Sequence, residues 1–192
     1  MRLVALVLAA GRATRFGSDK LAASLRGEPL LFHAIRAARA APVERVIVVA
    51  RPGLETGTWE GDPPVETLRL ESAALSASLK AGVAAAGSVD GAFVFLGDMP
   101  AVPWAEAARL AARLGGAYAA LPRRRGQPGH PVLLASRAFA DIARLTGDAG
   151  AGQLLRGRSD VVFDDCEDAA IHADVDRPED LRRLEQDQAG PR

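Results

Sequence analysis

A chain of 192 residues is long enough for one well-buried core and short for two. Hydrophobic residues make up 48% and charged residues 25%, as in an ordinary globular domain, and 24 basic residues balance 24 acidic ones. Because the formal net charge is zero, no overall field attracts DNA, RNA or an acidic membrane. We therefore expect no nucleic-acid and no membrane partner, and any anion binding has to be local.

No segment approaches the roughly 20 apolar residues that are needed to cross a bilayer. The apolar run after Met1 is short for a signal peptide and leads into an arginine-bearing loop, which favours a first strand and a cytoplasmic protein. The single Cys166 excludes an internal disulfide and a cysteine-only zinc site, and its acidic neighbours disfavour a thiolate. The three histidines stand in no metal-ligand spacing.

Apolar runs typical of buried strands alternate with segments whose apolar residues recur at helical spacing. In chain order the sequence predicts strand 3–8, helix 30–41, strands 45–50 and 65–70, helix 75–86, strand 92–96, helix 104–114, strands 118–121 and 132–134, helix 136–145, strands 161–163 and 171–175, and helix 178–186. This alternation predicts an α/β domain with a mostly parallel sheet. We expect one domain over residues 1–186 and a loose tail over residues 187–192.

The first predicted strand leads into a glycine-bounded loop, Ala9-Ala10-Gly11-Arg12-Ala13-Thr14-Arg15-Phe16-Gly17-Ser18-Asp19-Lys20. Small side chains let backbone N–H groups approach a ligand, and Arg12, Arg15 and Lys20 would face a polyanion. The loop therefore indicates a phosphate cradle, with a nucleotide as the expected occupant. Its spacing fits neither the Walker pattern nor the dinucleotide fingerprint, which disfavours an ordinary kinase, GTPase or dehydrogenase. The alternative is a polar loop whose arginines are merely solvated.

A second motif, Gly97-Asp98-Met99-Pro100, also follows a predicted strand directly. Ligands of parallel sheets bind outside the carboxyl ends of the strands, so we expect this motif and the opening loop to meet at one site. A carboxylate opposite a cationic phosphate loop is well placed to hold Mg²⁺ against a triphosphate, which makes Asp98 the best metal candidate. The alternative is a turn aspartate that accepts backbone N–H groups before Pro100.

Three further motifs carry weaker predictions. Asp174 and Asp176 would point to one face of a strand, and Asp176 also suits a helix N-cap. The helix N-terminus around Ser76 and Ser78 suits a phosphate or a base edge, although ordinary capping by Ser76 explains the serines equally well. His130, between Gly129 and Pro131, either shapes a substrate pocket or is a hydrogen-bonded structural histidine.

Taken together, the motifs resemble the molybdenum-cofactor cytidylyltransferase branch of the small MobA-like nucleotidyltransferase family. Six segments carry the resemblance in the right order and cover nearly the whole chain. They are Leu8 to Lys20, Leu75-Ser76-Ala77-Ser78-Leu79-Lys80-Ala81-Gly82, Leu96 to Pro100, Gly129-His130-Pro131-Val132-Leu133, Gly147-Asp148-Ala149-Gly150-Ala151, and Asp174 to Leu181. Each segment is weak or moderate alone, whereas the ordered set is specific.

The resemblance implies a Rossmann-like three-layer domain that transfers a nucleoside monophosphate from an NTP and releases pyrophosphate. It implies Mg²⁺ as the cofactor, CTP as the donor (from the Ala9-Ala10-Gly11 form of the loop), a molybdopterin-type phosphate as the acceptor, and a molybdoenzyme or its chaperone as a further partner. The residues implied to bind the nucleotide are Ala9, Ala10, Gly11, Arg12, Ser76 and Ser78. Those implied to act in catalysis are Lys20, Arg15 and Asp98, and those implied to hold the metal are Asp98 and Asp176.

The sequence departs from the family pattern at three places. Phe16 stands where the family usually has Met, Ala74-Leu75 replaces Gly-Met, and Gly152 follows Gly150-Ala151 where the family usually has an arginine. If that arginine holds the organic substrate, the acceptor differs or binds more weakly. Two alternatives therefore stay open: a nucleotidyltransferase with another base or acceptor, of the guanylyltransferase or sugar-phosphate type, and a non-catalytic nucleotide- or cofactor-binding module.

Overall fold

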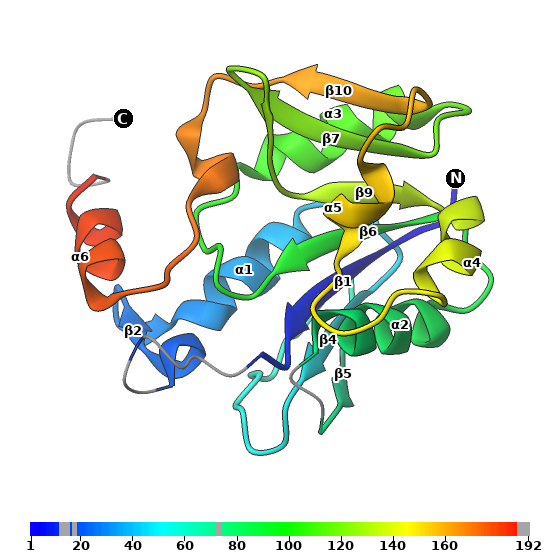
Figure 1. Cartoon of the computed structure of the whole chain (residues 1–192). Coiled ribbons are helices and arrows are strands. Elements are labelled where there is room, and N and C mark those ends of the chain that lie inside the picture. The colour runs from blue at the N-terminus through cyan, green and yellow to red at the C-terminus, as the bar shows by residue number, and fades with distance from the viewer. Residues whose placement is uncertain (12–15, 17–18, 72–73, 188–192) are drawn as a thin grey trace.

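An eight-stranded sheet runs through the middle of the computed structural model, which describes residues 1–11, 16, 19–71 and 74–187 (Figure 1). The strands are β1 (Leu3–Ala9), β4 (Val46–Ala50), β5 (Val65–Arg69), β6 (Gly91–Leu96), β7 (Ala119–Arg124), β8 (Gln127–Pro128), β9 (Val132–Ala135) and β10 (Val161–Asp165). They are ordered β10-β7-β9-β6-β1-β4-β5, and β8 pairs with β7. The short strands β2 (Ser24–Leu25) and β3 (Glu28–Pro29) form a separate antiparallel pair.

The pairing of the strands confirms a mostly parallel sheet. β1 pairs in parallel with both β4 and β6, β4 with β5, and β7 with β10, whereas β9 runs antiparallel between β6 and β7. Because β1 and β6 are parallel and in register, Leu8 lies opposite Leu96, and the Gly97 N–H donates to the Leu8 carbonyl at 2.9 Å. The segments that follow β1 and β6 therefore leave the sheet side by side, as the sequence predicts.

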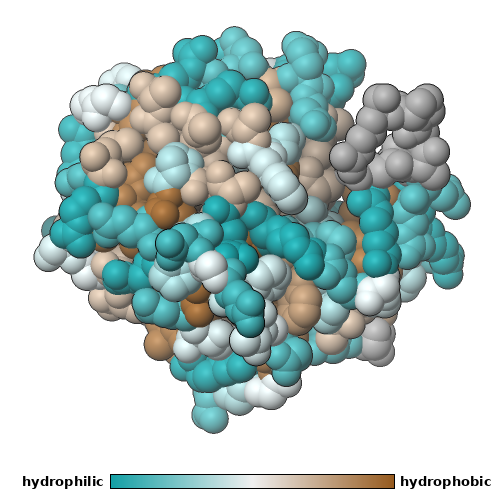
Figure 2. Space-filling model, turned by 180° about the vertical axis from the view of Figure 1, so that it is seen from behind, coloured by the Kyte–Doolittle hydropathy of each residue, from teal (hydrophilic) through white to brown (hydrophobic). Residues whose placement is uncertain are grey.

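Helices cover both faces of the sheet and complete the predicted three-layer α/β fold. One layer contains α1 (Leu30–Arg39), α3 (Trp104–Leu114) and α6 (Pro178–Asp187), and the other contains α2 (Leu75–Ala86), α4 (Phe139–Ile142) and α5 (Ala151–Leu155). All seven residues of β1 are buried because its alternate side chains enter the two cores. Seen from behind, the outer surface is mostly hydrophilic, with apolar residues scattered over it (Figure 2).

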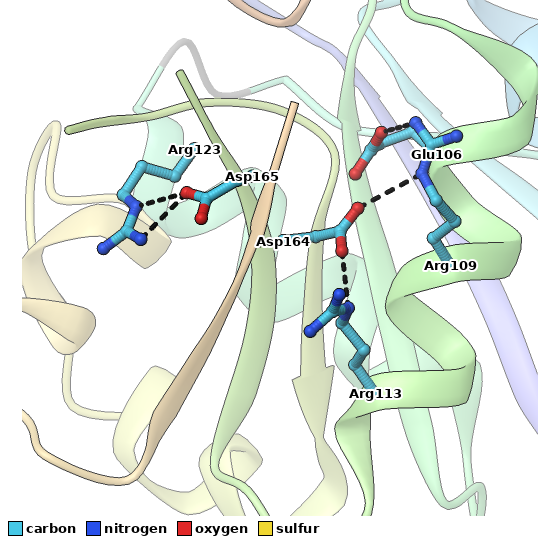
Figure 3. A network of polar contacts seen from close by, with 6 residues as sticks. All are labelled: Glu106, Arg109, Arg113, Arg123, Asp164 and Asp165. Carbon is cyan, nitrogen blue, oxygen red and sulfur yellow. Dashed lines mark hydrogen bonds and ion pairs between the residues drawn. The ribbon is translucent and has the colours of Figure 1, made fainter. Parts of the chain in front are cut away.

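Buried acidic groups fasten α3 to the edge strand β10 (Figure 3). The Asp164 carboxylate accepts from Arg109 Nε at 3.1 Å and pairs with Arg113 Nε at 2.5 Å, and Arg109 also contacts the fully buried Glu106. Cys166 lies at the same place, where burial, reinforced by the Glu106 charge, raises the pKa of its thiol. The direction agrees with the prediction that Cys166 is a poor thiolate, but the cause is burial together with Glu106 of α3 rather than the acidic sequence neighbours.

Two predicted elements differ from the structure. Residues 171–175 do not form a strand: a 3₁₀ turn, η3 (Ala169–His172), is followed by a loop. The Asp168 side chain accepts from the Ala170 N–H and starts the turn, while Ile171 and Val175 are buried as anchors of an irregular segment. Asp174 and Asp176 therefore share no strand face. The predicted helix 136–145 is a 3₁₀ turn, η2 (Ser136–Ala138), followed by the short α4.

The ends of the helices are close to the predicted ones. α6 includes Asp187, one residue beyond the predicted end of the domain, and residues 188–192 lie outside the described part of the chain. None of the helices described is both long enough and apolar enough to span a membrane.

Candidate active site

Three charged side chains from distant parts of the sequence meet at the carboxyl edge of the sheet. Lys20 Nζ donates to Asp98 Oδ2 at 2.7 Å and to Asp176 Oδ1 at 2.9 Å. Lys20 begins the 3₁₀ turn η1 (Lys20–Ala22), Asp98 follows β6, and Asp176 precedes α6. These segments lie on the left of the sheet in Figure 1, where the blue segment around β2 lies near the red helix α6. The structure thus brings together Lys20, Asp98 and Asp176.

Close packing of the backbone fixes the position of Asp98. A Cβ atom at Gly97 would lie 3.1 Å from both the Leu8 carbonyl oxygen and a Leu31 methyl carbon, so glycine lets the chain leave β6 close against β1. The Asp98 side chain accepts from Lys20, and its carbonyl accepts from the Val175 N–H at 2.9 Å. The alternative interpretation of Asp98 as only a turn aspartate does not account for its ion pair with Lys20.

The hydrogen bond from the Val175 N–H to the Asp98 carbonyl also brings Asp176 to the site. Val175 is tied to the Asp98 carbonyl, so the next residue lies beside the Asp98 carboxylate. The Asp180 side chain accepts from the N–H groups of Asp176 at 3.1 Å and Arg177 at 2.9 Å, which holds the first turn of α6 in place. Asp180 therefore acts as a helix-start residue, as the sequence favours for the acidic residues of this turn.

The local charges favour a cation at this place. Burial opposes the charge on Lys20, but its hydrogen bonds to Asp98 and Asp176 outweigh burial and raise the pKa of its ammonium group. Burial also raises the pKa of Asp174, and the charges of Asp176 and Asp98 act in the same direction. Among the residues that the structure describes here, the carboxylates of Asp98, Asp174 and Asp176 outnumber the ammonium group of Lys20, which favours further positive charge.

The residues at this site fit a divalent metal that is completed by a substrate. Within the ranges that the structure describes, no three His, Cys, Asp or Glu side chains form a metal cage. Asp98 and Asp176 nevertheless direct carboxylate oxygens at one cation position, which Lys20 Nζ shares. Mg²⁺ is commonly held by one or two carboxylates together with substrate phosphates, so this pair of oxygen ligands suits it.

The opening loop is described only in part. Ala9 and Ala10 are buried at the end of β1, Gly11 is exposed, and Phe16 packs against the core. Arg12 and Arg15, which the sequence predicts to contact phosphates, lie outside the described residues.

The two predicted serines face the protein interior. Ser76 Oγ donates to the Gly147 carbonyl at 2.7 Å, and the Ser76 N–H donates to the same oxygen at 3.2 Å. Ser78 Oγ donates to the Ala74 carbonyl at 3.4 Å. The N-cap of α2 is Ala74, which makes no side-chain cap, so the alternative of capping by Ser76 is wrong. Ser76 instead joins α2 to the loop that leads into α5.

A pocket of about 560 Å³ opens beside the charged site, between α2, α5 and the strands β6, β7, β9 and β10. Gly129, His130 and Val132 belong to its lining, which places the predicted Gly-His-Pro-Val motif at a pocket. A Cβ atom at Gly129 would lie 2.7 Å from the Ile171 carbonyl oxygen, so glycine is required for this close approach. The sequence analysis missed α5 as a pocket wall, although Ala151, Leu154 and Leu155 are apolar at helical spacing.

His130 is a neutral group at this pocket. Its Nδ1 is buried and has no hydrogen-bond partner among the described residues. Burial lowers the pKa of His130, and a hydrogen bond with the Val94 backbone and the charges of Asp98 and Asp174 only partly offset that effect. His130 is therefore not the fully hydrogen-bonded structural histidine of the alternative interpretation, because its Nδ1 lacks a partner among the described residues.

The stability of the protein should respond to the pH through His130. Because its pKa is lower in the folded than in the unfolded chain, the unfolded state binds more protons as the pH falls through about 6.5. We expect the wild type to lose on the order of 1 kcal/mol more unfolding free energy than His130→Gln between about pH 8 and pH 5. Urea denaturation at several pH values measures this difference, and parallel curves for the two proteins would contradict the assignment.

Comparison with known proteins places this geometry in a family. The model of the MobA-like NTP transferase domain matches residues 5–162. A probable molybdenum cofactor guanylyltransferase of Pyrococcus horikoshii is 36% identical over 103 residues, which are 53% of this chain and 51% of that protein. A 2-C-methyl-D-erythritol 4-phosphate cytidylyltransferase of Laribacter hongkongensis is also 36% identical over 103 residues, which are 50% of this chain and 45% of that protein.

A solved structure agrees over the whole fold. Rv0371C of Mycobacterium tuberculosis H37Rv, crystallised as a complex with manganese, superimposes with a TM-score of 0.81 at 25% identity. That likeness covers 97% of this chain and 99% of the mycobacterial chain. The family match and the fold agree, and the chain belongs to the family of MobA-like NTP transferase domains, as a nucleotidyltransferase.

Proposed function

We propose that this protein transfers CMP from CTP to the phosphate of a molybdopterin-type acceptor, with Mg²⁺ as cofactor and release of pyrophosphate. The observation that carries the proposal is the convergence of Lys20, Asp98 and Asp176 on one position beside the loop that follows β1. An ammonium group and two carboxylates at the mouth of a parallel sheet suit a triphosphate that is bound together with a divalent cation.

In this mechanism an acceptor phosphate oxygen attacks the α-phosphorus of the NTP in line. A new P–O bond forms, the bond from the α-phosphorus to the oxygen bridging the β-phosphate breaks, and pyrophosphate leaves with that electron pair. Asp98 and Asp176 would hold Mg²⁺, which supplies neutralisation of the phosphate charge. Lys20 would contact phosphate oxygens, with Arg15 and Arg12 adding positive charge from the loop. Catalysis then rests on positioning and charge stabilisation rather than on a covalent intermediate.

The choice of CTP rests on the start of the opening loop. Ala9, Ala10 and Gly11 give the form that resembles the cytidylyl-transferring branch, and the Ala10 methyl group is buried at the end of β1. A methyl group in place of a second glycine would reduce the room for a base, which favours the smaller pyrimidine. Ser76 and Ser78, at the start of α2, stay proposed nucleotide-binding residues through the backbone of this helix end. Guanylyl transfer is the second candidate, favoured by the Pyrococcus relative.

The proposal also includes where the protein works and what receives its product. We place the reaction in the cytoplasm, with a molybdoenzyme or its chaperone as the partner that takes the nucleotide-bearing cofactor. The balanced charge of the chain supports a small-molecule substrate over nucleic acid.

A pyrophosphate-release assay tests the proposed function. The protein is incubated with CTP, GTP, ATP or UTP, with and without Mg²⁺, and with a molybdopterin-containing extract as the source of acceptor. We expect release with CTP that requires both Mg²⁺ and the extract. Faster pyrophosphate release with GTP than with CTP would show that the protein is a guanylyltransferase rather than a cytidylyltransferase. Tight CTP binding by calorimetry without any release would instead favour the non-catalytic nucleotide-binding module.

A further inference from the structure

We propose that the pocket between α2, α5 and the sheet binds the acceptor, and that Arg156 recognises an anionic group of that molecule. This inference rests on the proposed function and assigns to it a second subsite and a residue that determines specificity. The acceptor class would be an organic anion with a flat, uncharged body.

The walls of the pocket suit an uncharged ring system. Leu75 and Leu79 of α2, Leu96 of β6, Leu121 of β7 and Phe163 of β10 all lie in the lining. A volume of about 560 Å³ is in the range of cavities that enclose small organic ligands. The residues that line it include no Asp or Glu, so nothing charged in the walls repels an anion.

The charged groups of the lining are two arginines, and they differ in what they contact. Arg158 pairs with Asp160 at 2.8 Å, and its guanidinium lies 3.5 Å from the centre of the Tyr118 ring. The guanidinium of Arg156 makes no hydrogen bond and no ion pair within the part of the chain that the structure describes. Arg158 is thus held as part of the wall, whereas Arg156 is exposed and available to a ligand.

The packing of α5 gives Arg156 a defined place. Arg156 directly follows α5 as its C-cap, with an extended backbone, and both Arg156 and Gly152 of the helix line the pocket. A Cβ atom at Gly150 would lie 2.6 Å from a Leu75 methyl carbon, so α5 begins in direct contact with α2. The two hydrogen bonds from Ser76 to the Gly147 carbonyl tie the preceding loop to the same helix. The wall that carries Arg156 is therefore formed before a ligand binds.

The pocket also adjoins the reacting centre. Leu96 lines it and lies two residues before Asp98 in the chain. His130 lines it as well, and it is close enough to Asp98 and Asp174 for their charges to act on its titration. A molecule in the pocket would thus lie next to the carboxylates that are proposed to hold the NTP and its metal. His130, whose pKa is lowered by burial, adds no positive charge to the part of the pocket that faces Asp98.

A fluorescence titration with two pterins tests the proposal. One probe carries a phosphomonoester and the other is the same pterin without phosphate, and each is titrated against the wild type, Arg156→Ala and Arg156→Lys. The control is Arg144→Ala, because Arg144 is 82% exposed and outside the pocket lining. We expect Arg156→Ala to lower the affinity for the phosphorylated probe by about tenfold or more and to leave the affinity for the other probe unchanged. Arg156→Lys should restore part of the affinity, and Arg144→Ala should alter neither titration.

Each other outcome overturns the proposal. If Arg156→Ala lowers the affinity for both probes equally, or for neither, Arg156 does not recognise the anionic group. If neither probe binds the wild type saturably, the pocket is not the acceptor site. A cooperative melt of each variant shows that it is folded. Because the readout is binding, it is separate from the proposed function: failure of that function appears as no pyrophosphate release with any NTP, whatever the pterin titrations give.

Discussion

Asp98→Asn is expected to lower Mg²⁺-dependent pyrophosphate release by about a hundredfold or more, the scale of losing one preorganised electrostatic group in an active site. The substitution keeps the shape of the side chain but removes the charge that would hold the metal and that now pairs with Lys20 at 2.7 Å. Asp98 is a quarter exposed, so the loss of this ion pair should cost about 1 kcal/mol of unfolding free energy or less. Initial rates across a Mg²⁺ titration, together with a thermal melt, measure both effects.

Asp165→Asn is the matched control for this prediction. Asp165 is the last residue of β10 and also carries a carboxylate, but it is largely exposed and pairs with Arg123 of the neighbouring strand β7 (Figure 3). Its variant should keep the wild-type rate and Mg²⁺ dependence. Full activity of Asp98→Asn, or an equal loss of activity in Asp165→Asn, would contradict the assignment of Asp98 as a metal ligand.

Lys20→Gln should separate the two roles of the ammonium group. We expect turnover to fall by about a hundredfold, because the proposed contact with the phosphates is lost. In the absence of nucleotide, however, Mn²⁺ should bind the variant at least as tightly as the wild type. The reason is that Lys20 Nζ contacts both Asp98 and Asp176, so a metal has to share these oxygens with it. Mn²⁺ titration followed by electron paramagnetic resonance measures the affinity, and a pyrophosphate assay measures turnover.

A surface arginine of α6 provides the comparison for Lys20. Arg182 is 69% exposed and pairs with Glu179 on its own helix, so Arg182→Gln removes a positive charge six residues after Asp176 in the chain without removing a contact of the charged site. It should change neither Mn²⁺ affinity nor turnover. If Lys20→Gln instead weakens Mn²⁺ binding, the ammonium group supports the metal site rather than competing for it.

The sequence predicts the sheet well because of how β1 and β6 are buried. Both strands are covered on two faces, so they appear as unbroken apolar runs, and the polar loops that follow them mark the carboxyl edge of the sheet. The meeting of the opening loop with Asp98 follows from parallel pairing alone. These predictions depend on local patterns and on one general property of parallel sheets.

Other parts depend on contacts that no local pattern encodes. Residues 171–175 look like a strand because Ile171 and Val175 are apolar, yet both are anchors beneath a turn that starts at Asp168. The backbone bond from Val175 to the Asp98 carbonyl, which brings Asp176 to the site, joins two segments far apart in the chain. The pocket wall at α5 was missed because five residues are too few for a helical period to stand out.

The position of Lys20 and Asp176 at one site has a consequence during protein synthesis. The two residues are 156 positions apart, so nearly the whole chain has to be translated before they can meet. A nascent chain could already form β1, β4, β5 and β6 while the segment that carries Asp176 is still inside the ribosome. The charged site would then be completed in the last stage of synthesis, so that a prematurely terminated chain retains much of the sheet but lacks Asp176.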